Sequence, residues 1–350
     1  MKIGTIALLV VGVIIVNPEI RAPSVSRFVH GGGPIVPGGL WPFVFITIAC
    51  GAISGFHGLV GSGTTSKLID RESHARMVGY GAMLIEAAVA LVALIAASSL
   101  AEGDYFAINT PADKFAALGL SMDHLPELSE QIGERLAGRA GGAVSLAVGM
   151  SQIFSSLPGL KHLLAYWYHF AIMFEALFVL TTVDAGTRIA RFLVQESVGR
   201  IAPRWGRTDW MPGALAATAL VCLGWSYLVW SGSIAMLWPL LGVANQLLAC
   251  IALCTMTGWL LNQGRARYAW VTLLPLVFVG TATETAGWQL ITRQFWPRLI
   301  GSGRPALVFQ GWLLTSVCGV AMVALLAILA ELALTWRRLE VRCIEAPSSL

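Results

Sequence analysis

The sequence Cys50-Gly-Ala-Ile-Ser-Gly-Phe-His-Gly-Leu-Val-Gly-Ser-Gly-Thr-Thr-Ser66 ends an apolar run, residues 40–66, that is long enough to cross a bilayer. Its five glycines are Gly51, Gly55, Gly58, Gly61 and Gly63. A glycine inside a helix costs up to about 1 kcal/mol relative to alanine, so a continuous helix would be weak here. The stretch predicts a broken membrane helix. Close packing of two helices through small residues is the alternative interpretation.

A broken helix at membrane depth has a chemical consequence. Non-helical backbone survives there only where protein or a water-filled cavity satisfies its polar groups, and such breaks bind substrates and ions in secondary transporters. The predicted binding residues in this stretch are Ser54, Gly55, His57, Ser62, Gly63, Thr64 and Thr65. His57 is also a candidate proton carrier, because histidine titrates near neutral pH. A buried, neutral, hydrogen-bonded histidine is an equally good interpretation.

The composition of the whole chain indicates an integral membrane protein. Of 350 residues, 56% are hydrophobic and only 12% are charged, whereas soluble domains carry about 25% charged residues. The net charge of +4 is small, so nucleic acid is not an expected partner; the lipid bilayer is. We therefore predict an all-α, polytopic membrane protein.

Apolar runs predict eight membrane-crossing helices. They are Met1–Val16, Leu40–Ser66, Met77–Leu100, Leu163–Val183, Met211–Ser231, Ile234–Leu260, Ala269–Leu290 and Pro305–Thr335. A ninth run, Ala140–Leu157, is shorter and rich in Gly and Ser. If it crossed the membrane, the arginine-rich segment Asp184–Trp210 would lie outside the cytoplasm, against the positive-inside rule. We therefore expect it to dip in or lie flat, with both termini cytoplasmic and an acidic, solvated outer loop at 101–162.

Acids inside the predicted helices are candidates for carrying a coupling proton, because a carboxylate at the bilayer centre costs several kcal/mol. Glu175 is the deepest of these and Glu86 is next. A protonated Glu that donates one interhelical hydrogen bond is the alternative for each. Glu284 and Glu331 lie near predicted helix ends, where interfacial solvation is the simpler account.

Two further polar pairs are candidates. Asp184 and Arg188 are four residues apart and can pair on one helix, as a gate or as a helix-end anchor. Asn245 and Gln246 interrupt an apolar run, where they predict either substrate or ion contact or interhelical hydrogen bonding. The sequence has no P-loop, GxSxG, HExxH or dinucleotide-binding motif. We therefore expect no enzyme activity, no cofactor and no metal.

Several motifs together resemble the carbon starvation protein A (CstA) family of bacterial inner-membrane transporters. They are Phe45-Ile-Thr-Ile-Ala-Cys-Gly-Ala-Ile-Ser-Gly-Phe-His57 with Ser62-Gly-Thr-Thr65, Trp167-Tyr-His-Phe-Ala-Ile172 with Phe174-Glu-Ala-Leu177, Val183-Asp-Ala-Gly-Thr-Arg188, Leu237-Trp-Pro-Leu240 with Ala244-Asn-Gln-Leu247, and Arg267-Tyr-Ala-Trp-Val271. The resemblance implies uptake of pyruvate or small peptides during carbon starvation, coupled to protons. It also implies a fold of two inverted five-helix repeats.

On this resemblance, residues 1–350 form a single membrane domain that corresponds to the C-terminal portion of the family. Residues 1–16 would be part of the first repeat, 40–260 the second repeat, 269–335 two additional helices and 336–350 a cytoplasmic tail. The N-terminal half would be missing, and a separate chain is one candidate to supply it. A truncated or accessory subunit without transport activity of its own is the alternative function. Glu284 departs from the family pattern.

Overall fold

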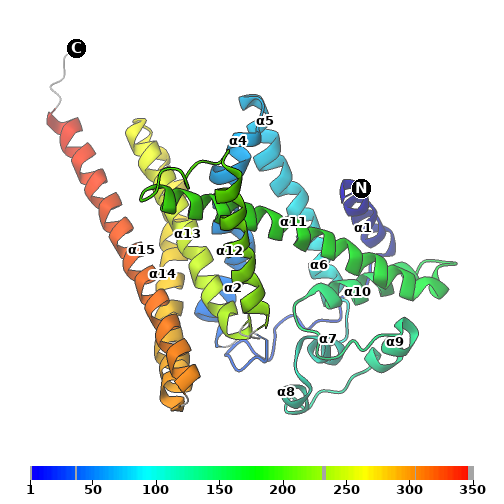
Figure 1. Ribbon diagram of the computed structural model, residues 1–350. Helices are drawn as coiled ribbons and strands as arrows, with labels where there is room; N and C mark the ends of the chain where they lie inside the picture. Colours follow the sequence, from blue (N-terminus) through cyan, green and yellow to red (C-terminus); the bar gives the residue numbers. More distant parts are fainter. Residues whose placement is uncertain (1, 36–37, 231–233, 304, 346–350) are drawn as a thin grey trace. The chain divides into compact units, whose positions relative to one another are not determined.

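The computed structural model describes residues 2–35, 38–230, 234–303 and 305–345, and across these ranges the regular structure is helical, with no β-strand (Figure 1). This confirms the all-α prediction. Within these described ranges, five helices are long and apolar enough to cross a membrane: Leu40–Leu68, Glu72–Ser98, Lys161–Gly199, Leu241–Asn262 and Leu307–Arg337. The predicted number of eight crossings stays a prediction, as does the tail at 336–350, whose last five residues lie outside the described ranges.

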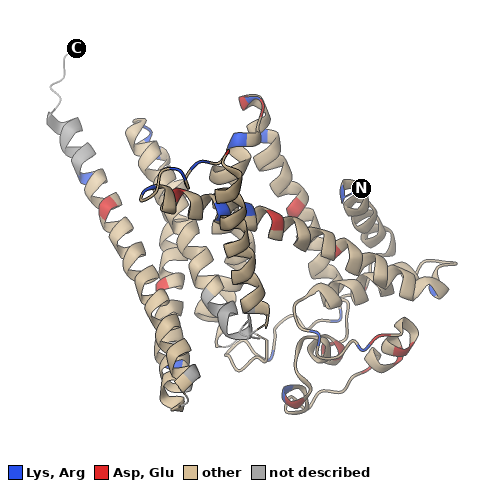
Figure 2. Cartoon of the chain, in the orientation of Figure 1, with Lys and Arg blue, Asp and Glu red and all other residues tan. Residues whose placement is uncertain are grey.

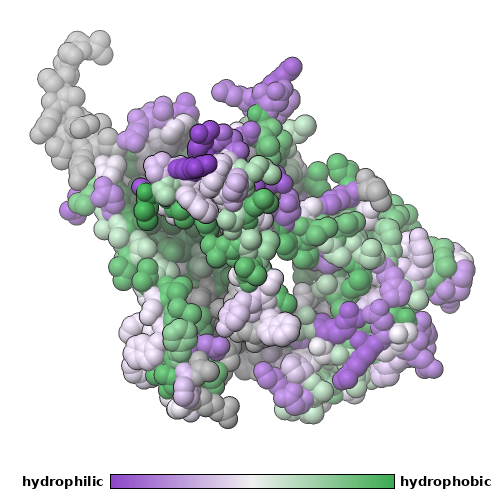
Figure 3. All heavy atoms as spheres, in the orientation of Figure 1, coloured by the Kyte–Doolittle hydropathy of each residue, from purple (hydrophilic) through white to green (hydrophobic). Residues whose placement is uncertain are grey.

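Charge is confined to a small part of the molecule. Lys, Arg, Asp and Glu lie mainly near helix ends and in the segment that carries the short helices α7 (Glu102–Asn109), α8 (Ala112–Ala116) and α9 (Leu125–Ile132) (Figure 2). Apolar side chains cover the flanks of the long helices (Figure 3). Large side chains on these flanks are exposed, among them Leu94, Leu180, Leu223 and Val320, each more than 60% accessible. Such a surface is stable only against lipid, so the chain is a multi-pass membrane protein.

The contacts divide the chain into two compact units, and the boundary falls inside the long helix α11 (Leu164–Gly199). The first unit comprises Met1–Pro37 and Leu68–Gly186. It contains α1 (Lys2–Val16), α5 (Glu72–Arg76) with η3 (Met77–Gly81), α6 (Ala82–Ser98), α7 (Glu102–Asn109), α8 (Ala112–Ala116), α9 (Leu125–Ile132), α10 (Ala143–Ser155), η4 (Lys161–Leu163) and the start of α11.

The first unit is built around α10, which is buried along most of its length against α1 and α6. A Cβ atom at Gly149 would lie 2.2 Å from the carbonyl oxygen of Ala96, so only glycine allows this approach of α10 to α6. At 13 residues α10 is about 20 Å long, less than the roughly 30 Å hydrocarbon core. That this segment does not cross the membrane stays a prediction.

The segment predicted to be an outer loop, residues 101–162, is folded rather than simply solvated. Its organising residue is Asp104, which is 2% exposed. The Asp104 carboxylate accepts hydrogen bonds from the backbone N–H groups of Asp123, His124 and Leu125 at 2.9–3.2 Å. Because a carboxylate that accepts several N–H groups is well compensated for its burial, one acid fastens α7 to the start of α9.

The second unit comprises Gly38–Lys67 and Thr187–Leu350. Its elements are η1 (Leu40–Val44), α2 (Phe45–Ala52), α3 (Gly55–Val60), η2 (Gly61–Thr65), α4 (Ser66–Leu68), α12 (Met211–Trp230), α13 (Ile234–Asn262), η5 (Ala266–Tyr268), α14 (Trp270–Leu290), η6 (Ile291–Leu299), η7 (Ile300–Ser302) and α15 (Pro305–Glu345). Helix α13 packs against α14, α15, α2 and α3. It is therefore the central helix of this unit.

Helix α11 corrects one predicted boundary. The sequence predicts a membrane helix that ends at Val183, followed by an arginine-rich loop, but the helix continues for sixteen residues to Gly199. Residues 184–199 contain no proline and are rich in good helix formers, so the charges alone do not end the helix. The loop begins only at Arg200.

Candidate functional site

The predicted broken helix is interrupted at two residues, between α2 and α3. Ile53 has φ −133° and ψ 68°, and Ser54 has φ −79° and ψ 121°, so neither is helical. The helix resumes at Gly55 and runs through η2 to Leu68. The densest glycines, at 58–63, thus lie within helical structure, and the break lies just before them.

The side chain of Asn245 on α13 forms hydrogen bonds with residues on both sides of the break. Its Oδ1 atom accepts a hydrogen bond from the backbone N–H of Phe56 at 2.8 Å and one from the Ser54 hydroxyl at 3.3 Å. Its Nδ2 atom donates to the Sγ atom of Cys50 at 3.1 Å and to the Cys50 carbonyl at 3.5 Å. One amide therefore contacts both ends of the interrupted helix, supplying partners for backbone groups that the break removes from the helical ladder.

Gly55 brings the first turn of α3 directly onto α13. A Cβ atom at position 55 would lie 2.2 Å from the carbonyl oxygen of Asn245 and 2.6 Å from the amide nitrogen of Ala249. Gly58, one turn later, would place its Cβ 3.7 Å from that of Ala252. Both interpretations of the glycine-rich stretch therefore describe part of it: the helix is broken, and its glycines also permit close packing.

The hydroxyl groups after the break have limited freedom. Ser62 donates to the carbonyl of Gly58 at 2.8 Å, and Thr64 donates to that of Val60 at 3.1 Å. Their protons are therefore committed to their own helix, and only oxygen lone pairs are left for a ligand. Thr64 is buried and Thr65 is half-buried. A Cβ atom at Gly63 would lie 3.8 Å from the Cγ1 atom of Ile189.

The remaining predicted residues of this unit separate into exposed and buried groups. His57 is exposed on α3, two residues after Gly55. Gln246 is fully buried, and neither polar atom of its side chain has a hydrogen-bond partner among the described residues. It lies about 100° around α13 from Asn245 and four residues before Cys250, which is in the core with α14 and α15. Adjacent in sequence, Asn245 and Gln246 thus have different surroundings.

The candidate coupling acids belong to the first unit. Glu86 is exposed on α6, while Glu175 is half-buried on α11 and forms no hydrogen bond or ion pair with any described residue. The candidate gate residues Asp184 and Arg188 are both exposed on α11. Their predicted roles stay predictions.

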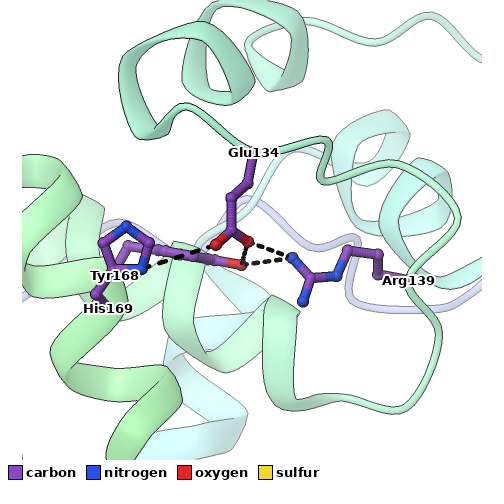
Figure 4. Close-up of polar contacts among 4 residues, drawn as sticks. All are labelled: Glu134, Arg139, Tyr168 and His169. Carbon is purple, nitrogen blue, oxygen red and sulfur yellow. Dashed lines mark hydrogen bonds and ion pairs between the residues drawn. The ribbon is translucent and has the colours of Figure 1, made fainter.

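Sequence reasoning missed a polar cluster in the first unit (Figure 4). Arg139 Nη1 donates to Glu134 Oε2 at 2.6 Å and to the Tyr168 hydroxyl at 3.2 Å, and His169 Nδ1 lies 3.9 Å from Glu134 Oε1. The hydrogen bond to Glu134 raises the pKa of Arg139. The cluster joins the outer loop to the start of α11. Tyr168 lies 29 residues from Arg139 and 34 from Glu134 in the sequence, so no local pattern indicates their contact.

Comparisons with known proteins agree on one family. The family model described as "Carbon starvation protein CstA" matches residues 1–286. The chain is 49% identical over 292 residues to "Peptide transporter CstA" of Bacillus subtilis (strain 168), which covers 83% of this chain and 49% of that protein. It is 45% identical over 314 residues to "Peptide transporter CstA" of Escherichia coli (strain K12), covering 83% and 45%.

A relative with a different name matches almost as well. "Pyruvate/proton symporter BtsT" of Escherichia coli (strain K12) is 40% identical over 332 residues, covering 82% of this chain and 46% of that protein. The chain thus spans about half the length of these relatives. The matches give no support to a separate chain as the source of an N-terminal half. No solved structure matches the chain. On the family match and the identities, the chain belongs to the carbon starvation protein CstA family.

Proposed function

We propose that this chain is part of a secondary active transporter that takes up pyruvate or small peptides across the bacterial inner membrane under carbon starvation, with protons as the coupling ion. The observation that carries the proposal is that the Asn245 side chain forms hydrogen bonds with both ends of the break. A helix break at membrane depth costs free energy because backbone polar groups lose their helical partners. Breaks that the surrounding structure stabilises are concentrated at functional sites. Relatives named for peptide transport and for pyruvate/proton symport support the substrate class.

The two substrate classes share a carboxylate, and the break offers a suitable place for one. The first N–H groups of a helix lack intrahelical partners and carry partial positive charge, and α3 opens a helical stretch that continues to Leu68. Asn245 engages the N–H of Phe56. In the proposal the substrate carboxylate lies at this helix start, near Ser54, Gly55 and His57, and Ser62, Gly63, Thr64, Thr65 and Gln246 are the further candidate contacts.

The proposed coupling residues are Glu175, Glu86 and His57, with Asp184 and Arg188 as the gate. We place 1–350 in one membrane domain with eight crossings, both termini in the cytoplasm, residues 40–260 as the second of two inverted repeats and 269–335 as two additional helices. A truncated or accessory subunit is the alternative, and the names of the relatives do not favour it.

Uptake of labelled pyruvate and of a labelled dipeptide into inner-membrane vesicles, with and without an inward proton gradient, tests the function. We expect gradient-dependent uptake of at least one of them. Glu175→Gln and His57→Ala should each reduce uptake by about a hundredfold or more, the lower end of the typical contribution of a proton-transfer group, with membrane insertion unchanged. Wild-type uptake that is the same with and without the gradient would refute proton coupling. Normal uptake by both variants would refute the roles of Glu175 and His57 in coupling.

A further inference from the structure

A groove of ≈ 740 Å³ lies between α14 and α15 in the second unit. Its walls are mainly apolar, from Leu273, Leu276 and Val277 on α14 and Leu326, Leu329 and Leu332 on α15. Val277 and Leu326, at its edges, are 63% and 55% exposed, so the groove opens toward an apolar surface. Its α15 wall lies beyond residue 286, where the family match ends.

The groove has one acid and one base among its lining residues, far apart along the helices. Gly287 on α14 lies against Met322 and Cys318 of α15, and Gly311, earlier on α15, lies against Leu299 and Ile300, which follow α14. The two contacts together show an antiparallel arrangement. Glu284 is therefore level with the residues near Leu326, and Arg337 is level with Leu273. Eleven residues separate these levels, or about 16 Å at 1.5 Å per residue. This is close to half of the roughly 30 Å hydrocarbon core, the depth of one lipid leaflet.

The deep end of the groove favours a neutral carboxyl group. Glu284 was expected near a helix end, but the helix continues from α14 through η6 to Leu299, so Glu284 is an interior residue. Its Oε1 atom is closed to solvent and has no hydrogen-bond partner among the described residues. The hydroxyl groups of Thr281 and Thr285 donate to carbonyls of their own helix. Since no base of the groove lies at this level, an ionised Glu284 would be uncompensated.

The shallow end has the opposite character. Arg337 is exposed there, beside Trp336, and tryptophan and arginine are the residues that mark membrane interfaces and bind lipid phosphates. We propose that this groove holds one acyl chain of an anionic membrane phospholipid, whose phosphate pairs with Arg337 and whose chain extends to Glu284. Apolar walls, leaflet length and a single base at the interface match such a lipid. An extended peptide would instead bring unpaired backbone groups into an apolar groove.

Native mass spectrometry of the purified full chain, titrated with phosphatidylglycerol, tests the site. Arg337→Gln should weaken binding about fivefold, the effect of one basic residue at an anionic membrane surface. Gly280→Leu should abolish site binding, because a Cβ at Gly280 meets open space within the groove. The matched controls are Arg293→Gln, outside the groove lining, and Gly319→Leu, whose Cβ also meets open space but not in the groove. Equal binding by variants and controls, or equal affinity for zwitterionic phosphatidylethanolamine, would overturn the proposal.

Chemical labelling gives a second readout that does not depend on a variant folding. The apolar reagent dicyclohexylcarbodiimide modifies protonated carboxyl groups, and mass spectrometry locates the product. In wild-type protein, phosphatidylglycerol should protect Glu284 and leave the labelling of Glu331, which is exposed on α15 outside the groove lining, unchanged. Labelling of Glu284 that is insensitive to the lipid would contradict occupancy of the groove.

Discussion

Gly55→Ala is expected to reduce uptake strongly. The new methyl group would lie 2.2 Å from the carbonyl oxygen of Asn245 and 2.6 Å from the amide nitrogen of Ala249. These are backbone atoms of α13 and cannot rotate away, so α3 and α13 must separate and the hydrogen bond from Phe56 to Asn245 lengthens. Overpacking of this kind costs about 1–3 kcal/mol. If this cost falls on the transport-competent conformation, uptake should fall by about five- to 150-fold, since each 1.4 kcal/mol is a factor of ten.

The matched control for this variant is Gly61→Ala. Gly61 lies in the same helical stretch, but a Cβ atom there meets nothing within 4 Å. Alanine should stabilise the helix by up to about 1 kcal/mol and leave uptake unchanged at equal protein level in the membrane. If the two variants lose uptake equally, glycine is required here for flexibility along the stretch rather than for contact with α13.

Asn245→Ala should have an effect of similar size by a different route. It removes the acceptor of the Phe56 N–H and the donor to Cys50 while leaving the packing of Gly55 in place. A buried donor left without a partner costs about 1–3 kcal/mol, and the break loses the group that fixes its two ends. We expect a loss of uptake of about five- to 150-fold and a lower melting temperature in detergent.

Ser54→Ala provides the graded comparison. It removes only the hydroxyl that donates to Asn245 Oδ1 at 3.3 Å, and the bond from Phe56 stays. A loss of about 1 kcal/mol or less is expected, which corresponds to a loss of uptake of about fivefold or less. An Asn245→Ala protein that transports and melts like wild type would show that the break does not depend on this amide.

Much of the fold follows from the apolar runs. The helices α1, α12 and α13 begin and end close to the predicted residues, because runs of about 20 apolar residues leave few alternatives in a membrane. Helix α14 begins as predicted, but helical structure continues past Leu290 through η6 to Leu299. The predicted end of α11 was wrong by sixteen residues. Arginines mark where a chain meets water, but they are good helix formers and do not end a helix.

The site was predictable in kind but not in detail. Glycine content indicated a break near residues 50–66, yet it could not give the position of the two non-helical residues, because that depends on where α13 presents Asn245. Sequence proximity also made Asn245 and Gln246 look equivalent, whereas α13 turns them toward different neighbours. The Glu134–Arg139–Tyr168 cluster joins a loop to a helix 29–34 residues away, a distance over which no local pattern operates.

The most direct test of the central claim is substrate protection at the break itself. Ser54→Cys replaces a hydroxyl with a thiol of similar size beside Asn245, and its alkylation by a small maleimide can be followed by peptide mapping in vesicles that contain the full chain. Gly61→Cys, in open space seven residues later, is the control. If the break binds substrate, saturating pyruvate or dipeptide should slow labelling at position 54 by about tenfold or more, as expected at ten times the dissociation constant, and leave position 61 unaffected. Labelling at position 54 that is unchanged by a substrate the vesicles demonstrably take up would contradict the account.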